Sequence, residues 1–163
     1  MLAPPLNLIL LHNRFSCYFI HYTFILSTLP LFLTMQKLQL PPNYQTVMPY
    51  LILKGAKQFL QFAKSIFAAE EVAVYHAPEG DGIMHGEIKI GDSLIMFAGA
   101  NEEYPSSTSG LYIHVASVDE TYRKALAEGA TSIIAPVKKD YGYMAGFSDP
   151  FGNVWWLAEA EVG

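Results

Sequence analysis

An internal repeat constrains the fold of this chain more than any other feature. Residues 47–98 and 110–159 show the same expected order of a strand, a helix and three further strands. The expected strands are 47–53, 71–77, 84–90 and 93–98 around a helix at 55–68, and then 110–116, 131–135, 142–148 and 153–159 around a helix at 118–128. Such a repeat predicts two copies of one supersecondary unit that pack against each other.

Local sequence signals support this order of elements. In the first helix, apolar residues between Phe59 and Phe67 recur at three- and four-residue spacing, which is the pattern of one buried helix face. The second helix is followed by Gly129, a typical C-terminal stop. Gly91-Asp92 lies between two strands and is typical of a tight hairpin.

The repeated βαβββ unit sets the fold class. One such unit cannot bury both faces of its sheet alone, so it needs a second layer to pack against. We therefore expect an α+β domain built from modules at about 44–99 and 110–161. The two modules are expected to form a curved mixed sheet around a cleft, with the helices on the outer face.

Alternation along the strands predicts which side chains face the cleft, because successive strand residues point to opposite faces. Toward the helices we expect Val47, Leu51, Leu53, Leu111, Ile113, Val115 and Trp155. Toward the cleft we expect Met48, Tyr50, Ile52, Tyr112 and His114.

Charge and cysteine content exclude several classes of function. The chain has 10 Lys and Arg against 15 Asp and Glu, a net charge of −5. An acidic domain without a basic stripe is unsuited to nucleic acid, whose phosphates require Lys and Arg. The single cysteine, Cys17, precedes the repeat. Disulfides, cysteine-ligated zinc and thiol catalysis are therefore excluded within the repeated domain.

Residues 1–34 form an apolar extension outside the repeat, and three interpretations compete for it. The uncharged run 15–33 is nearly as long as a membrane span of ~20 residues, but His21 and Pro30 interrupt it. A signal peptide would need a more basic start than Arg14 alone. We favour translation from Met35, with residues 35–163 as a cytoplasmic domain. Membrane anchoring or export is the alternative if 15–33 is retained.

Four motifs carry a resemblance to a known family. They are VMPYLIL from Val47, HGEIKIGDSLIM from His85, VDETYRKALAEGA from Val118 and DPFGNVWW from Asp149. With the repeated units, they resemble the vicinal oxygen chelate superfamily, which includes glyoxalase I, bleomycin-resistance proteins and extradiol dioxygenases. The PhnB-like subgroup is the most similar, although Met144 occupies a position where that subgroup often has arginine. The resemblance implies a homodimer.

The metal-binding positions implied by this resemblance do not hold metal ligands. They fall on Met48, Met96, Gly110 and Trp156. None of these side chains suits zinc, nickel or iron, which are bound through imidazole or carboxylate. We therefore expect no metal cofactor.

His85, Glu87 and His114 are the remaining candidates for catalysis or metal binding. His85 and Glu87 lie two residues apart on one expected strand and share a face, and His114 faces the cleft by parity. They could bind a metal in a non-standard way or act as an acid–base pair. The simpler interpretation, which we favour, is that they are polar residues of a wet cleft or sheet edge.

The expected cleft is rich in aromatic and thioether side chains. Its predicted ligand-binding residues are Met48, Tyr50, Met96, Tyr112, His114, Met144 and Trp156. Such a surface suits a flat or apolar small molecule, although residues filling a closed core have the same composition.

Three functions fit these observations. The first is binding of a small aromatic or amphipathic molecule without metal. The second is a lyase, isomerase or dioxygenase that depends on zinc, nickel, iron or manganese. The third is an interaction module whose cleft is filled by its own side chains.

Overall fold

The computed structural model describes residues 38–78 and 80–161. The apolar run 15–33 and the start expected at Met35 lie outside these residues. The elements are β1 (Tyr50–Leu53), α1 (Ala56–Phe67), β2 (Glu70–His76), β3 (Ile83–Ile90), β4 (Ser93–Gly99), β5 (Gly110–Val115), α2 (Val118–Ala127), β6 (Thr131–Lys139), β7 (Gly142–Ser148) and β8 (Val154–Glu159). No helix of the described part is long and apolar enough to cross a membrane.

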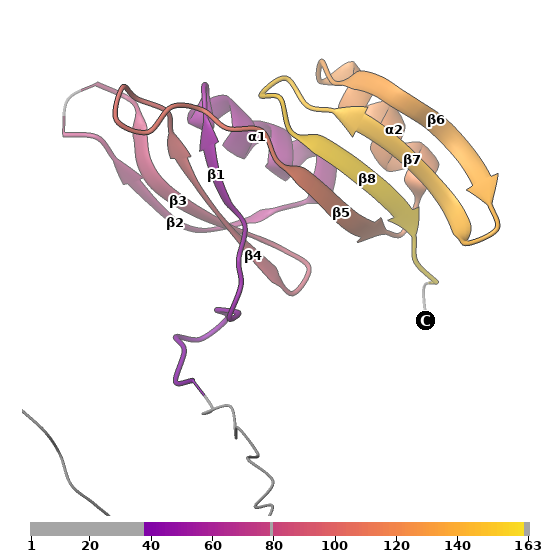
Figure 1. Ribbon diagram of the computed structural model, residues 1–163, viewed down its shortest axis with the longest axis horizontal. Coiled ribbons are helices and arrows are strands. Elements are labelled where there is room, and N and C mark those ends of the chain that lie inside the picture. The colour runs from indigo at the N-terminus through magenta and orange to yellow at the C-terminus, as the bar shows by residue number, and fades with distance from the viewer. Residues whose placement is uncertain (1–37, 79, 162–163) are drawn as a thin grey trace, which may run out of the picture. The chain divides into compact units, whose positions relative to one another are not determined.

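The strand order confirms the predicted repeat. The first module forms a four-stranded sheet in the order β1-β4-β3-β2, and the second repeats it as β5-β8-β7-β6. In each sheet the first strand pairs in parallel with the fourth, whereas the other pairs are antiparallel. Figure 1 shows the two sheets and the helices α1 and α2 behind them, on the same side of both.

The two sheets are separate rather than one continuous sheet, because β1 and β5 are not paired with each other. Part of the outer edge of β1 is occupied by the segment 105–109 instead. There the backbone N–H of Ser107 donates to the carbonyl of Ile52 over 3.2 Å. The linker between the modules therefore lies where a fifth strand of the first sheet would begin.

Helix α1 packs against both modules. Phe59 is fully buried, and its ring meets Phe97 of β4 at 5.4 Å and Phe151 of the second module at 5.7 Å. Phe67 lies 4.6 Å from the ring of Trp155 in β8. One hydrophobic core therefore includes α1 and both sheets, and Trp155 is on the helix side as predicted.

A buried carboxylate organises the turn before β8. Asp149 is only 4% exposed. Its Oδ1 accepts the backbone N–H groups of Phe151 (2.9 Å) and Asn153 (2.8 Å). Its Oδ2 accepts the side-chain amide of Asn153 and the indole N–H of Trp155, both at 2.9 Å. Four donors therefore bond to one side chain, and these bonds explain why the DPFGNVWW motif forms this turn.

The first strand is shorter than predicted. It begins at Tyr50 rather than at residue 47, and Val47 is 85% exposed, so the prediction that Val47 faces the helices is wrong. Pairing with β4 starts at the carbonyl of Pro49, which accepts from the N–H of Met96. Proline has no N–H to extend the ladder, so the preceding residues 38–49 form a lead-in segment outside the sheet.

Candidate functional site

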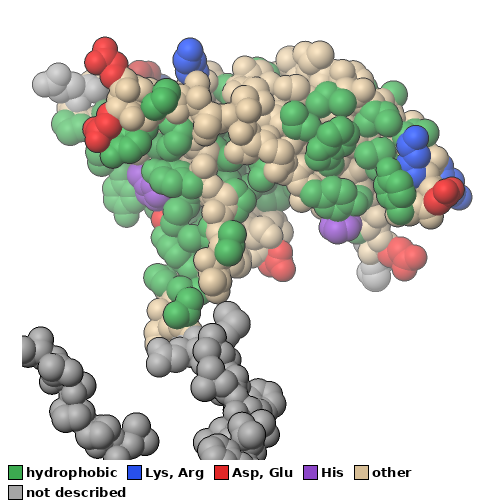
Figure 2. Space-filling model, in the orientation of Figure 1, with side chains coloured by type: hydrophobic (Ala, Val, Ile, Leu, Met, Phe, Trp, Pro, Cys, Tyr) green, Lys and Arg blue, Asp and Glu red, His purple; other side chains and the backbone are tan. Residues whose placement is uncertain are grey.

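The faces of the two sheets that point away from the helices carry most of the predicted ligand-binding residues. In the first sheet Tyr50 lies opposite Met96, and Met96 lies opposite Glu87. In the second sheet Tyr112 lies opposite Trp156. Figure 2 shows this side of the molecule, where hydrophobic side chains spread over both sheets and histidines appear at two separate places.

A hydrogen-bonded chain of four side chains lies on the face of the first sheet. The hydroxyl of Tyr44, from the lead-in segment, donates to Glu87 Oε1 over 2.6 Å. His85 Nε2 lies 3.2 Å from the same oxygen, and His85 Nδ1 lies 3.4 Å from the hydroxyl of Tyr50. We call Tyr44, Tyr50, His85 and Glu87 the tyrosine–carboxylate cluster. Tyr75 packs at its rim, with its ring centroid 6.1 Å from that of His85.

The hydrogen bonds of the cluster keep Glu87 ionised. The hydrogen bond from Tyr44 is the largest effect and lowers the pKa of Glu87. Burial opposes it, and the weaker effect of the hydrogen bond from His85 lowers the pKa further. The same bond raises the pKa of Tyr44. Glu87 is therefore an ionised carboxylate that is only 8% exposed. When His85 donates from Nε2 to Glu87, its Nδ1 is left to accept a hydrogen bond from Tyr50 or from a bound hydroxyl.

Replacement of Tyr44 by phenylalanine tests this arrangement. A carboxyl whose pKa is lowered by folding contributes stability above its unfolded pKa, and that contribution is lost as the pH falls through the folded value. In Tyr44→Phe we expect the pKa of Glu87 to rise, and the loss of stability below pH 4.5, the reference value for Glu87, to become shallower. Carboxyl carbon NMR titration and unfolding curves at several pH values measure both. Tyr75→Phe is the control, and an unchanged Glu87 pKa in Tyr44→Phe would contradict the assignment.

The face of the second sheet is dominated by Trp156, which lies over a glycine. A Cβ atom added at Gly146 would come within 2.6 Å of Cζ3 of the Trp156 ring. The indole therefore rests on the backbone of β7, and Met144 beside it is buried. Tyr112 and His114 of β5 are exposed on the same face, with their rings 5.3 Å apart and nearly perpendicular.

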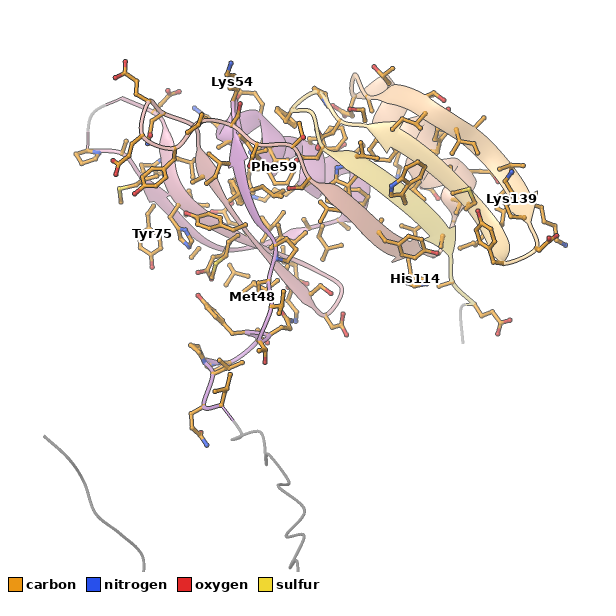
Figure 3. The ribbon with its side chains drawn as sticks, in the orientation of Figure 1. Met48, Lys54, Phe59, Tyr75, His114 and Lys139 are labelled. Carbon is orange, nitrogen blue, oxygen red and sulfur yellow. The ribbon has the colours of Figure 1, made fainter. Side chains whose placement is uncertain are left out.

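The structure brings together His85 and Glu87 but not His114. His114 belongs to the edge strand of the second sheet, and Figure 3 shows it well apart from Tyr75, which lies beside His85. Among the described residues, no three His, Cys, Asp or Glu side chains are placed to hold a metal ion. His85 and Glu87 therefore form a pair within the tyrosine–carboxylate cluster.

The positions implied to bind metal have unsuitable chemistry in the folded protein as well. Met96 is half-buried beside Tyr50, the Trp156 ring is stacked on β7, and Gly110 has no side chain. Met48 lies on the lead-in segment, as labelled in Figure 3. These residues offer no imidazole or carboxylate, so they do not fit zinc, nickel or iron.

A cavity of about 400 Å³ lies between the modules, next to β5. Tyr112 and His114 contribute to its lining, whereas Tyr50, Met96, Met144 and Trp156 do not. Its other walls come from the lead-in segment, from the hairpin between β3 and β4 with the adjoining strand ends, and from Trp155 of β8. The predicted ligand-binding residues are therefore divided between this cavity and the open sheet faces.

Sequence reasoning missed Tyr44, Tyr75 and Gly146 as parts of these surfaces. Tyr44 lies 43 residues from Glu87 and outside any element, so no periodicity could place it. Strand alternation could have placed Tyr75, because it lies two residues after Ala73 on β2, on the same face. These two residues pair with Glu87 and His85. The position of Gly146 under the Trp156 ring depends on the pairing of β7 with β8, which the sequence does not show.

Comparison with known families decides the classification. The profile of the Glyoxalase/Bleomycin resistance protein/Dioxygenase superfamily matches residues 49–157, which is more than half of the chain. The chain belongs to this superfamily. The match includes β1 to β7 completely and most of β8, so the glyoxalase-type profile extends over both modules.

Several solved structures share the glyoxalase-type fold. The putative 3-demethylubiquinone-9 3-methyltransferase PhnB protein of Bacillus cereus is 16% identical, with a TM-score of 0.61, and the match covers 71% of this chain and 100% of that one. A glyoxalase/bleomycin resistance protein/dioxygenase family enzyme of Burkholderia phytofirmans PsJN is 20% identical (TM-score 0.52, 69% and 95%). TnmS3, an antibiotic binding protein of Streptomyces sp. CB03234, is 18% identical (TM-score 0.54, 72% and 100%). Identities this low establish the shared fold alone, and no curated protein matches the sequence.

Proposed function

We propose that this protein binds a small aromatic or amphipathic molecule on the sheet faces that point away from the helices, without the usual metal of the superfamily. The observation that carries this proposal is the presentation of aromatic side chains there. Tyr50 and Tyr112 are 51% and 62% exposed, although each lies in a regular strand beside a second large side chain. Faces filled by their own side chains would hide these rings, which argues against a closed interaction module.

Two further observations support a binding function. Aromatic rings and thioethers provide apolar contact, while phenols, His85 and Glu87 provide directional hydrogen bonds, a combination typical of small-molecule sites. One protein with the same fold, TnmS3, is described as an antibiotic binding protein. The metal-dependent alternative lacks such support, because its four positions hold side chains without suitable donor atoms.

Trp156→Ala tests the proposal directly. Truncation of a central aromatic contact weakens binding by about 2 kcal/mol or more, so we expect at least a tenfold loss of affinity. The probe is 8-anilinonaphthalene-1-sulfonate, an amphipathic aromatic dye, titrated by fluorescence. Gly146→Ala should also weaken binding, because its new Cβ displaces the Trp156 ring.

The matched control is Tyr104→Ala, which removes an exposed tyrosine of the linker that belongs to neither sheet face. Its affinity for the dye should equal that of the wild type. Unchanged affinity in both Trp156→Ala and Gly146→Ala would count against the proposed site.

Assembly and location are further parts of the proposal. We expect a homodimer, as the resemblance implies, and no nucleic-acid partner, as the acidic charge predicts. We also expect a cytoplasmic protein, which follows from translation starting at Met35. Sedimentation of the purified chain, with and without the dye, measures the assembly state. Elemental mass spectrometry of the same untagged sample tests the metal content, and near-stoichiometric zinc, nickel, iron or manganese would favour the enzymatic alternative.

A further inference from the structure

The outer edge of β5 presents unpaired backbone groups. In its parallel ladder with β8, the carbonyls of Ser109 and Val115 accept from N–H groups of residues 154 and 160. Alternate residues of a strand direct their backbone groups to opposite sides. The N–H and C=O groups of Gly110, Tyr112 and His114 therefore point away from β8. Within the described residues, no backbone partner meets them.

A groove follows this edge. The cavity of about 400 Å³ and a second one of about 350 Å³ both include Ile113 and His114 in their lining, and they also share Ile90 and Gly91. Together they border the chain from Leu111 to Ser117. From Leu111 to Val115, the free edge of β5 therefore borders open space instead of a neighbouring element.

The walls of the groove are largely uncharged. Val47, Pro49, Ile95 and Trp155 contribute apolar surface to the first cavity, and its lining contains one carboxylate, Asp92, but no Lys or Arg. In the second cavity Lys124 is paired with Glu120 over 2.8 Å. An uncharged occupant therefore suits the groove better than an anion.

The other module shows what kind of group fits such an edge. Tyr50 and Tyr112 hold equivalent positions, because they pair with Met96 and Trp156 at the same point of each sheet. At the edge of β1, the linker segment 105–109 contributes one backbone hydrogen bond, from the Ser107 N–H to Ile52 O, without joining the sheet as a strand. Polypeptide of this chain therefore reaches the outward backbone groups of the first edge, whereas the equivalent edge of β5 is left open.

We propose that the groove along β5 binds an extended, uncharged peptide segment of another molecule, which adds to the second sheet as a strand beside β5. The backbone groups of Gly110, Tyr112 and His114 would supply its hydrogen bonds, as in other cases of strand addition. The edge from Gly110 to His114 is about 13 Å long at the rise of a β-strand, which suits a ligand of about five residues. The peptide would bond to the backbone edge of β5, whereas the aromatic ligand proposed above would contact side chains of the sheet faces, and Tyr112 borders both.

The test uses the full chain and the capped peptide acetyl-Ser-Val-Thr-Val-Ser-amide, titrated by calorimetry. Its matched control carries N-methyl groups on alternate residues, which removes the donors that would face β5 and leaves the side chains unchanged. Two such controls are needed, one methylated at the odd residues and one at the even residues, because either set could face β5. We expect the unmodified peptide to bind, and the control whose methyl groups replace the donors facing β5 to bind at least tenfold more weakly. No binding, or equal binding of the unmodified peptide and both methylated forms, would overturn the proposal.

Proline variants of the protein test the same bonds from the other side. Gly110→Pro and His114→Pro each remove an outward N–H, and proline is tolerated on edge strands where its nitrogen faces solvent. Both variants should bind the peptide at least tenfold more weakly while unfolding at the wild-type temperature. Gly110→Pro is the safer variant, because it lies at the start of the strand, where a proline disturbs folding least. Tyr104→Ala is the control. Wild-type affinity for the peptide in a folded proline variant would contradict the proposal. A dimer of the wild-type protein that dissociates in the proline variants would also contradict it, since a second copy of the chain would then occupy the edge.

Discussion

Replacing Asp149 by alanine is expected to lower the free energy of unfolding by about 4 kcal/mol, because about 1–3 kcal/mol is lost for each buried polar group left unsatisfied. The Asp149 side chain accepts four hydrogen bonds, and three of the donor groups belong to Asn153 and Trp155, which are almost fully buried. Alanine would leave these donors without an acceptor and release the turn that starts β8. Urea denaturation followed by circular dichroism measures the change.

Asp149→Asn is the matched control for this prediction. Asparagine keeps one acceptor oxygen, so the two backbone bonds survive, but its amide would face the side-chain donors of Asn153 and Trp155. We expect the free energy of unfolding of Asp149→Asn to lie between that of the wild type and that of Asp149→Ala. A loss below about 1 kcal/mol in Asp149→Ala, the value of one ordinary hydrogen bond, would show that the network does not stabilise the turn.

Phe59→Ala is expected to lower the free energy of unfolding by about 4 kcal/mol, in the range found when buried aromatic residues are truncated. Phe59 is fully buried and lies edge-on to Phe97 and Phe151. Because these two rings belong to different modules, the cavity would weaken both the packing of α1 on its own sheet and its contact with the second module. The measurement is again urea denaturation.

Phe59→Leu provides the comparison, since an aliphatic side chain refills much of the space and costs about 1.5 kcal/mol or less. We therefore expect the free energy of unfolding of Phe59→Ala to lie clearly below that of Phe59→Leu. Equal stability of Phe59→Ala and Phe59→Leu would mean that the site collapses around the missing ring and that α1 does not hold the modules together through this residue.

The order of elements could be predicted from the sequence, because hydrophobic periodicity and an internal repeat are local signals that the fold obeys. The burial of Trp155 against α1 and the exposure of Tyr112 followed from strand alternation alone. Alternation failed at Val47, where the strand had not yet begun because Pro49 limits the ladder. The separation of the sheets could not be predicted either, since it depends on where the linker residue Ser107 places its N–H.

The candidate site was predictable only in part, because local patterns place residues on a face but do not show contacts between distant segments. Residue parity placed Tyr50 and Trp156 on the correct faces, and the spacing of His85 and Glu87 predicted that they share one. The bond from Tyr44 to Glu87 joins a lead-in segment to a strand far along the chain, so no local pattern reveals it. The same holds for the free edge of β5, which depends on the packing of the two modules.

The central claim is that an aromatic ligand binds on the sheet face that carries Trp156. The chain contains two tryptophans, and they report on opposite faces. The indole of Trp155 is buried and bonded to Asp149, whereas Trp156 lies on the opposite face over Gly146. Nitrogen–proton correlation spectra recorded during titration with 8-anilinonaphthalene-1-sulfonate follow both indole signals at once. We expect the Trp156 signal to shift with dye concentration while the Trp155 signal stays in place. Binding of the dye with an unmoved Trp156 signal would contradict it.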